Sequence, residues 1–244
     1  MRTDYPELFR DAAAVTKYEN VVYRPGGYSA AISARQRDLL RNLVRRSFAE
    51  PPVQHDFACG TGRALLMLAD EVRAGHGYDV SPAMLRGARD AGCTADLHLV
   101  PPDGPVPVPA HAGGPALVTM FRLLLNASPQ VRDRALAFAA AALPHRDAGL
   151  LVLENHGRRR SLRHLGRWRH RRDPWFSELS DREARDLLAR HGFELVAVHA
   201  FALTTRGWYD VPVLRAVAGL LDTYVAPGLA SLATDVLYVA RRMP

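Results

Sequence analysis

The stretch VQHDFACGTG, residues 53–62, decides the fold, because it joins a β-type run to a helical pattern through two glycines. Residues 53–58 are typical of a strand, and residues 63–72 place apolar side chains at helical spacing. Glycines at such a junction let a ligand approach the backbone, while the amides at the helix start point toward it. The stretch therefore predicts a ligand-binding turn at the end of a parallel strand.

The chain on both sides of this stretch alternates β-type runs with helical patterns, which indicates an α/β protein with a parallel sheet. The further strands are expected at 75–80, 94–100, 116–121, 149–154, 193–203 and 235–240. Helices are expected at 6–15, 32–46, 63–72, 82–91, 131–143, 181–190 and 213–224. Ser81 with Pro82, and Ser180 with Glu183, have the residue types of helix starts.

The ligand of the glycine turn is not expected to be a dinucleotide. The dinucleotide-binding fingerprint G-x-G-x-x-G/A has a small residue at the position where this sequence has Leu65. Asp56, four residues ahead of Gly60, would repel a pyrophosphate but suits a ligand that carries positive charge. The turn thus favours a cationic small molecule.

The net charge of +7 belongs to one segment, residues 158–173, which holds eight arginines and one aspartate. Such a run is most often a solvated helical face. It also suits an anion-binding wall, since arginines pair with carboxylate or phosphate. With Trp168 and Trp175 beside it, the segment from Arg158 to Arg172 also suits RNA, through phosphate contacts and base stacking.

Cysteine usage and hydropathy give further expectations. Two cysteines, Cys59 and Cys93, make no disulfide framework, and no Cys/His cluster has zinc spacing, so we expect no metal and a reducing, cytoplasmic setting. The polar start of the chain argues against a secretory signal, and no run is apolar enough to span a membrane.

Several motifs together resemble the class I S-adenosylmethionine-dependent methyltransferases. Asp56 followed by Gly60 and Gly62 is similar to the family's first motif, and Asp79 stands where the family holds the ribose hydroxyls. Met84 resembles the apolar residue that packs on adenine. The resemblance covers roughly residues 53–203 and the last strand; it also implies cofactor contacts at Ala58, Asp96, Leu97 and Phe121, the Asp96 carboxylate and the next amide reading adenine.

The resemblance implies a Rossmann-like fold with a mostly parallel seven-stranded sheet and helices on both faces. Residues 1–50 would form an N-terminal helical lid. Residues 51–244 would form the methyltransferase domain, with inserts at about 157–178 and 205–232. Under such a lid, Tyr18 would reach the cofactor and Tyr23 the acceptor, although aromatic residues in a preceding segment are more often packing residues.

The acceptor is expected beyond the ends of the fourth and fifth strands. His156 is a candidate general base there, its alternative being a cap before Gly157. Arg122 and Asn126 would hydrogen-bond a polar acceptor; alternatively, Asn126 caps the next helix and Arg122 pairs with a local acid.

The leading hypothesis is methyl transfer to an oxygen or nitrogen of a polar, anionic small molecule, as in specialised metabolism such as antibiotic biosynthesis. The first alternative is an RNA methyltransferase that uses the Arg158–Arg172 segment. The family's acidic residue opening the fourth strand and the Asn-Pro-Pro-Tyr tetrad of nucleic-acid enzymes are both missing, which disfavours RNA. A third hypothesis is a non-catalytic protein that keeps the fold for binding.

Overall fold

The computed structural model describes residues 26–109, 114–156, 161, 178–204, 206–226, 228–229 and 232–244. The expected helix at 6–15, Tyr18, Tyr23 and nearly all of the Arg158–Arg172 segment lie outside the described residues.

The core of the molecule is one sheet with strand order β3-β2-β1-β4-β5-β7-β6 in the described residues. The strands β1 to β5 pair in parallel, and only β7 runs antiparallel, between β5 and β6. The mostly parallel seven-stranded sheet is therefore confirmed. Its strands are β1 (Val53–Phe57), β2 (Ala74–Asp79), β3 (Asp96–Leu99), β4 (Ala116–Met120), β5 (Gly149–His156), β6 (Phe193–Phe201) and β7 (Asp235–Arg242).

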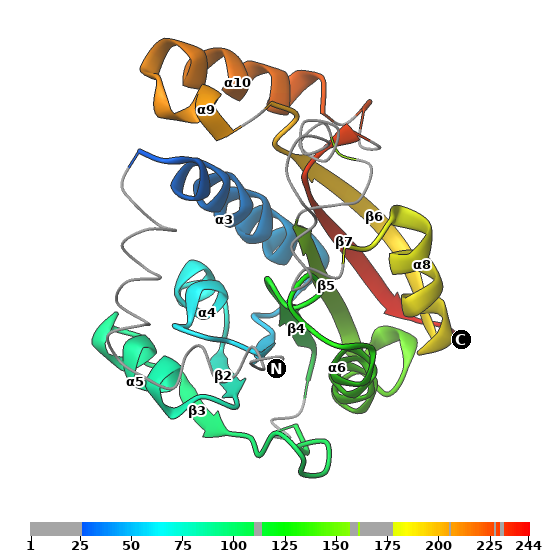
Figure 1. The fold of residues 1–244 in the computed structure, drawn as a ribbon. Helices are drawn as coiled ribbons and strands as arrows, with labels where there is room; N and C mark the ends of the chain where they lie inside the picture. Colours follow the sequence, from blue (N-terminus) through cyan, green and yellow to red (C-terminus); the bar gives the residue numbers. More distant parts are fainter. Residues whose placement is uncertain are drawn as a thin grey trace, which may run out of the picture.

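Helices cover both faces of the sheet (Figure 1). One apolar core joins β4, β5 and β7 to α6 and α8, and a second core joins the opposite face of these strands to α3 and α4. The long helices are α3 (Tyr28–Ser47), α5 (Pro82–Asp90), α6 (Pro129–Ala142), α8 (Asp181–Arg190) and α10 (Pro212–Tyr224). The short ones are α4 (Arg63–Leu68), η1 (Arg146–Ala148) and α9 (Arg206–Asp210), of which η1 and α9 were not expected.

The helix starts follow the sequence closely. The Ser81 hydroxyl accepts the Met84 amide at 3.2 Å, with Pro82 in the first turn. Ser180 and Glu183 form the expected capping box, and Ser128 rather than Asn126 caps α6. These bonds satisfy amide groups that a helix start leaves without intrahelical partners.

The helix α3 is a fixed layer of the domain. Its residues Ile32, Gln36, Leu40 and Val44 are buried, and the apolar ones join the core formed with α4 and the sheet. Residues 28–47 of the expected lid are thus a packed helix, and opening them would forfeit the packing energy of a buried apolar stripe. The lid over residues 1–50 stays a prediction.

A buried carboxylate fixes the insert between β6 and β7. Asp222 of α10 accepts the Leu203 amide at 2.9 Å and the Tyr209 hydroxyl, and it forms an ion pair with Arg35 of α3. The insert therefore lies beside α3, as Figure 1 shows. Among the described helices, none combines the length and apolar character needed to cross a membrane.

Candidate functional site

A cavity of about 500 Å³ lies at the carboxyl ends of β1, β2 and β4, where ligands bind in open parallel sheets. Its walls come from three places: the glycine turn and the starts of α4 and α5, the segment after β3, and the segment from the end of β4 into α6. The lining residues include Asp56, Ala58, Gly60, Arg63, Asp79, Met84, Pro102, Asp103, Phe121, Arg122, Asn126 and Arg134.

The two glycines of the turn have different roles. Both have a left-handed backbone, with φ of +55° at Gly60 and +77° at Gly62, which a side chain would strain. Gly60 lines the cavity, whereas Gly62 does not. A Cβ on Gly62 would lie 3.3 Å from both Ala88 and Cys93, so this glycine lets α4 and α5 pack closely.

Asp79, at the end of β2, is held by the backbone around the turn. Its carboxylate accepts the Gly60 amide at 2.8 Å and the Ser81 amide at 2.9 Å. Burial raises the pKa of Asp79, although these hydrogen bonds oppose the rise. The carboxylate is therefore oriented by two amides where it lines the cavity.

Asp56, at the wall beneath the turn, is 1% exposed. The Thr119 hydroxyl donates to it at 2.7 Å, and the Gln54 amide nitrogen donates to Thr119 at 3.1 Å. Burial raises the pKa of Asp56 to about 7, against the lowering effect of the Thr119 bond and of Arg63. Asp56 is thus a carboxylate poised to ionise fully when a cation binds beside it.

Asp96 and Leu97 do not line the cavity, and their expected contact with adenine stays a prediction. Asp96 is the first residue of β3, so it lies at the opposite edge of the sheet, where its side chain is 76% exposed and 3.7 Å from His76. The carboxylate that lines the cavity after β3 is Asp103. The turn-forming residues Pro101 to Gly104 carried the signal for it.

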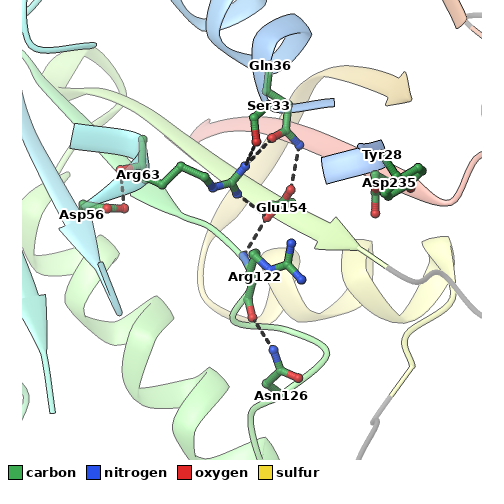
Figure 2. A network of polar contacts seen from close by, with 10 residues as sticks. Tyr28, Ser33, Gln36, Asp56, Arg63, Arg122, Asn126, Glu154 and Asp235 are labelled. Carbon is green, nitrogen blue, oxygen red and sulfur yellow. Dashed lines mark hydrogen bonds and ion pairs between the residues drawn. The ribbon is translucent and has the colours of Figure 1, made fainter. Parts of the chain in front are cut away.

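A buried polar network joins α3, α4, β5 and the turn after β4 (Figure 2). Glu154, 3% exposed, accepts the Gln36 amide nitrogen at 2.7 Å and pairs with Arg63 at 3.1 Å. Arg63 also donates to Gln36 and to Ser33, and its guanidinium lies 4.9 Å over the Phe121 ring. Burial alone would raise the pKa of Glu154, but Arg63, His156, Arg122 and Gln36 outweigh burial and lower it.

This network was not expected from the sequence. Its signal was an acidic residue, Glu154, two positions after the apolar Val152 on the same face of β5. A charge at such a position needs a buried partner.

The turn after β4 is pinned through the backbone of Arg122. This residue has φ of +56°, rare for a side chain other than glycine. Its amide donates to Glu154 at 2.8 Å, and its carbonyl accepts the Asn126 side chain at 2.9 Å (Figure 2). Arg122 and Asn126 both line the cavity, and their contact with an acceptor stays a prediction.

His156 is buried as the last residue of β5, on the same face as Glu154, and takes no part in the cavity wall. The structure therefore does not bring it to the residues that surround Asp56 and Asp79. Among the described residues, no group of three His, Cys, Asp or Glu side chains could hold a metal ion.

Comparison with known proteins gives a family match over most of the chain. A family model described as a methyltransferase domain matches residues 32–198. A search of curated protein sequences found no significant match.

Similar solved structures share the fold at low sequence identity. Magnesium protoporphyrin IX methyltransferase from Synechocystis PCC 6803, with bound SAH, is 14% identical over 97% of each chain, with a TM-score of 0.62. A chain from the complex of the Haloferax volcanii Trm112 methyltransferase activator with its methyltransferase is 17% identical over 100% of each chain, with a TM-score of 0.60. The [4+2]-cyclase SpnF is 18% identical over 84% of this chain and 81% of its own, with a TM-score of 0.52.

Proposed function

The chain belongs to the class I methyltransferase-domain family, with S-adenosylmethionine as cofactor, and from this premise we propose that it methylates a polar, anionic small molecule. The observation that carries the proposal is the distribution of charge in one cavity. Buried carboxylates lie at the glycine turn, and an arginine with a pinned backbone lies at the turn after β4.

The glycine-turn end of the cavity fits the cofactor. Asp79 presents carboxylate oxygens to a pair of hydroxyls, and Asp56 offers negative charge to a cationic ligand. Met84, Ala58 and Phe121 supply apolar surface. Asp103 takes the place after β3 that was expected of Asp96.

The bound cofactor supplies a methyl group on a positively charged sulfur, so the chemistry needs little from the protein except position. The chain's own residues hold the two reactants in line and keep water away from them. Because His156 does not line the cavity, the proposal does not require it as a base.

The acceptor end is the turn after β4. The left-handed backbone at Arg122 is held from both sides, by Glu154 and by Asn126, and Arg122 is one of the residues that line the cavity. Strained residues that are held in this way are frequent at functional sites. A guanidinium there suits an acceptor with a carboxylate or phosphate, and Asn126 adds a neutral hydrogen-bonding side chain.

The test of the cofactor end is calorimetry with S-adenosylmethionine and S-adenosylhomocysteine. Asp79→Ala should weaken binding about 100-fold, because it removes the oriented carboxylate. The exposed Asp90→Ala on α5 is the matched control and should stay within about twofold of the unaltered protein. Absence of binding by the unaltered protein would refute the proposal.

The test of the acceptor end compares carboxylated small molecules with their neutral amides, with S-adenosylhomocysteine release as the readout. Arg122→Ala should lower kcat/KM for the carboxylated set about tenfold or more and leave cofactor affinity unchanged. Equal losses on charged and neutral acceptors would contradict an anionic acceptor.

A further inference from the structure

The segment after β3 forms one wall of the cavity, and its sequence leaves it poor in backbone donors. Residues 101–109 contain five prolines, which have no amide hydrogen. The ladder of β3 continues only as far as the Val100 amide, which donates to the Asp79 carbonyl at 2.8 Å. Beyond that point, donors from side chains elsewhere in the chain are needed to bind the carbonyls of the segment and hold it in place.

One arginine of α6 supplies two such donors. The Arg134 guanidinium donates to the Pro102 carbonyl through one nitrogen and to the Pro105 carbonyl, at 2.8 Å, through the other. The Gly104 amide donates to the Pro101 carbonyl at 3.3 Å and so closes a turn over residues 101–104. The two carbonyls that Arg134 binds lie on either side of Asp103 in the sequence. Arg134 therefore spans the turn that carries Asp103.

The latched turn belongs to the cavity itself. Pro102, Asp103 and Arg134 all line it. Two residues earlier in α6, Arg132 is buried and donates to the Leu124 carbonyl through two nitrogens, which fixes the turn after β4 as well. One helix thus holds two segments that line the cavity.

We infer that Arg134 is a positioning residue for cofactor binding: it latches the proline-rich turn at 101–105 so that Pro102 and Asp103 stand ready at the cavity wall. The inference rests on the proposed function, since the ligand of this wall is the cofactor. A guanidinium suits the role because its planar donors can bridge two carbonyls at once, which a lysine ammonium does less well. Holding the turn in advance removes an ordering cost from binding.

The chain contains a matched control at the other end of β3. Arg89 also donates to two backbone carbonyls, those of Cys93 at 3.1 Å and Ala95 at 2.7 Å. Neither Arg89 nor these two residues line the cavity. Arg89→Ala removes the same kind of contact from the segment before β3, without changing a residue of the cavity wall.

The experiment measures S-adenosylhomocysteine affinity by calorimetry for Arg134→Ala, Arg134→Lys and Arg89→Ala. We expect Arg134→Ala to weaken binding about tenfold, Arg134→Lys to recover part of the loss, and Arg89→Ala to stay within about twofold of the unaltered protein. In turnover assays, Arg134→Ala should raise KM for the cofactor and leave kcat near its original value.

Hydrogen exchange then separates a latch from a direct ligand contact. In the ligand-free protein, Arg134→Ala should speed exchange of the Asp103, Gly104 and Val106 amides, whereas Arg89→Ala should affect only the segment before β3. Unchanged exchange at 103–106, or an equal loss of affinity in both alanine variants, overturns the inference. If the unaltered protein binds no cofactor, the proposed function itself is refuted. If the unaltered protein and Arg134→Ala bind the cofactor equally well, only the positioning role of Arg134 is refuted.

If Arg134→Ala does not fold, Arg134→Lys carries the test. Cofactor affinity of the Arg134→Lys variant within about twofold of the original, together with faster exchange at 103–106, would also overturn the latch, because a loosened turn would then not matter to binding.

Discussion

Asp56 and Glu154 are two carboxylates on the same sheet, both almost fully buried, yet their pKa values move in opposite directions. The Thr119 hydroxyl is the neutral partner of Asp56, so burial prevails and raises its pKa to about 7. Glu154 is paired with Arg63 and hydrogen-bonded by Gln36, so its pKa falls. The pairing, rather than the depth of burial, decides which carboxylate holds the structure together and which remains for a ligand.

The largest expected effect comes from breaking the paired carboxylate. Glu154→Ala takes from the partly buried Arg63 its ion-pair partner in this network and removes the acceptor of the Arg122 amide, so it should lower the free energy of unfolding by about 3–5 kcal/mol. Glu154→Gln, which keeps the size and an acceptor, should cost less. Urea denaturation measures both.

The control is a surface ion pair of the same kind. Glu194 pairs with Arg146 at 2.7 Å where both side chains are partly exposed, so Glu194→Ala should change stability by less than about 1 kcal/mol. Similar losses in Glu154→Ala and Glu194→Ala would show that the buried network has no special role.

A smaller effect on stability is expected from Asp56, the carboxylate whose partner is the neutral Thr119 hydroxyl, and this effect depends on pH. Because Asp56 has a pKa of about 7 in the folded chain and about 4 when unfolded, the folded state holds the extra proton between these values. The contribution of Asp56 to stability therefore falls as pH rises through this window. Affinity for S-adenosylmethionine, a cation, should rise as pH passes about 7, where Asp56 of the folded chain ionises.

Asp56→Asn removes that charge while keeping an acceptor for Thr119. Calorimetry should then show an affinity about tenfold lower at pH 8 and nearly equal at pH 6. If the variant keeps the pH dependence of the unaltered protein, the charge that matters for binding is not on Asp56.

The smallest effect is expected from Asp96, a carboxylate that belongs neither to the Glu154 network nor to the cavity wall. Asp96 is exposed at the far edge of the sheet, so Asp96→Asn should leave S-adenosylhomocysteine affinity within about twofold. Asp103→Asn, at the cavity wall, should weaken binding severalfold. If calorimetry shows a larger loss of affinity for Asp96→Asn than for Asp103→Asn, Asp96 rather than Asp103 contacts the cofactor.

The residues near the glycine turn were predictable because their roles are local. A strand, two glycines and a carboxylate at each of two strand ends define the turn, and Asp56, Ala58, Gly60, Asp79, Met84 and Phe121 do line the cavity. Asp96 does not line the cavity, and the reason is local as well: β3 begins at that residue instead of ending near it, and a four-residue strand gives little periodic signal to place its ends.

The sequence by itself determined the fold class, the parallel sheet and the cofactor turn, because hydrophobic period, helix caps and glycines act over a few neighbouring residues. Only the tertiary structure decided that α3 is a packed layer, that Glu154 joins Gln36 and Arg63, and that Arg134 holds the proline-rich turn. These contacts link residues from 27 to 118 positions apart, and the three-dimensional packing alone brings their donors and acceptors together.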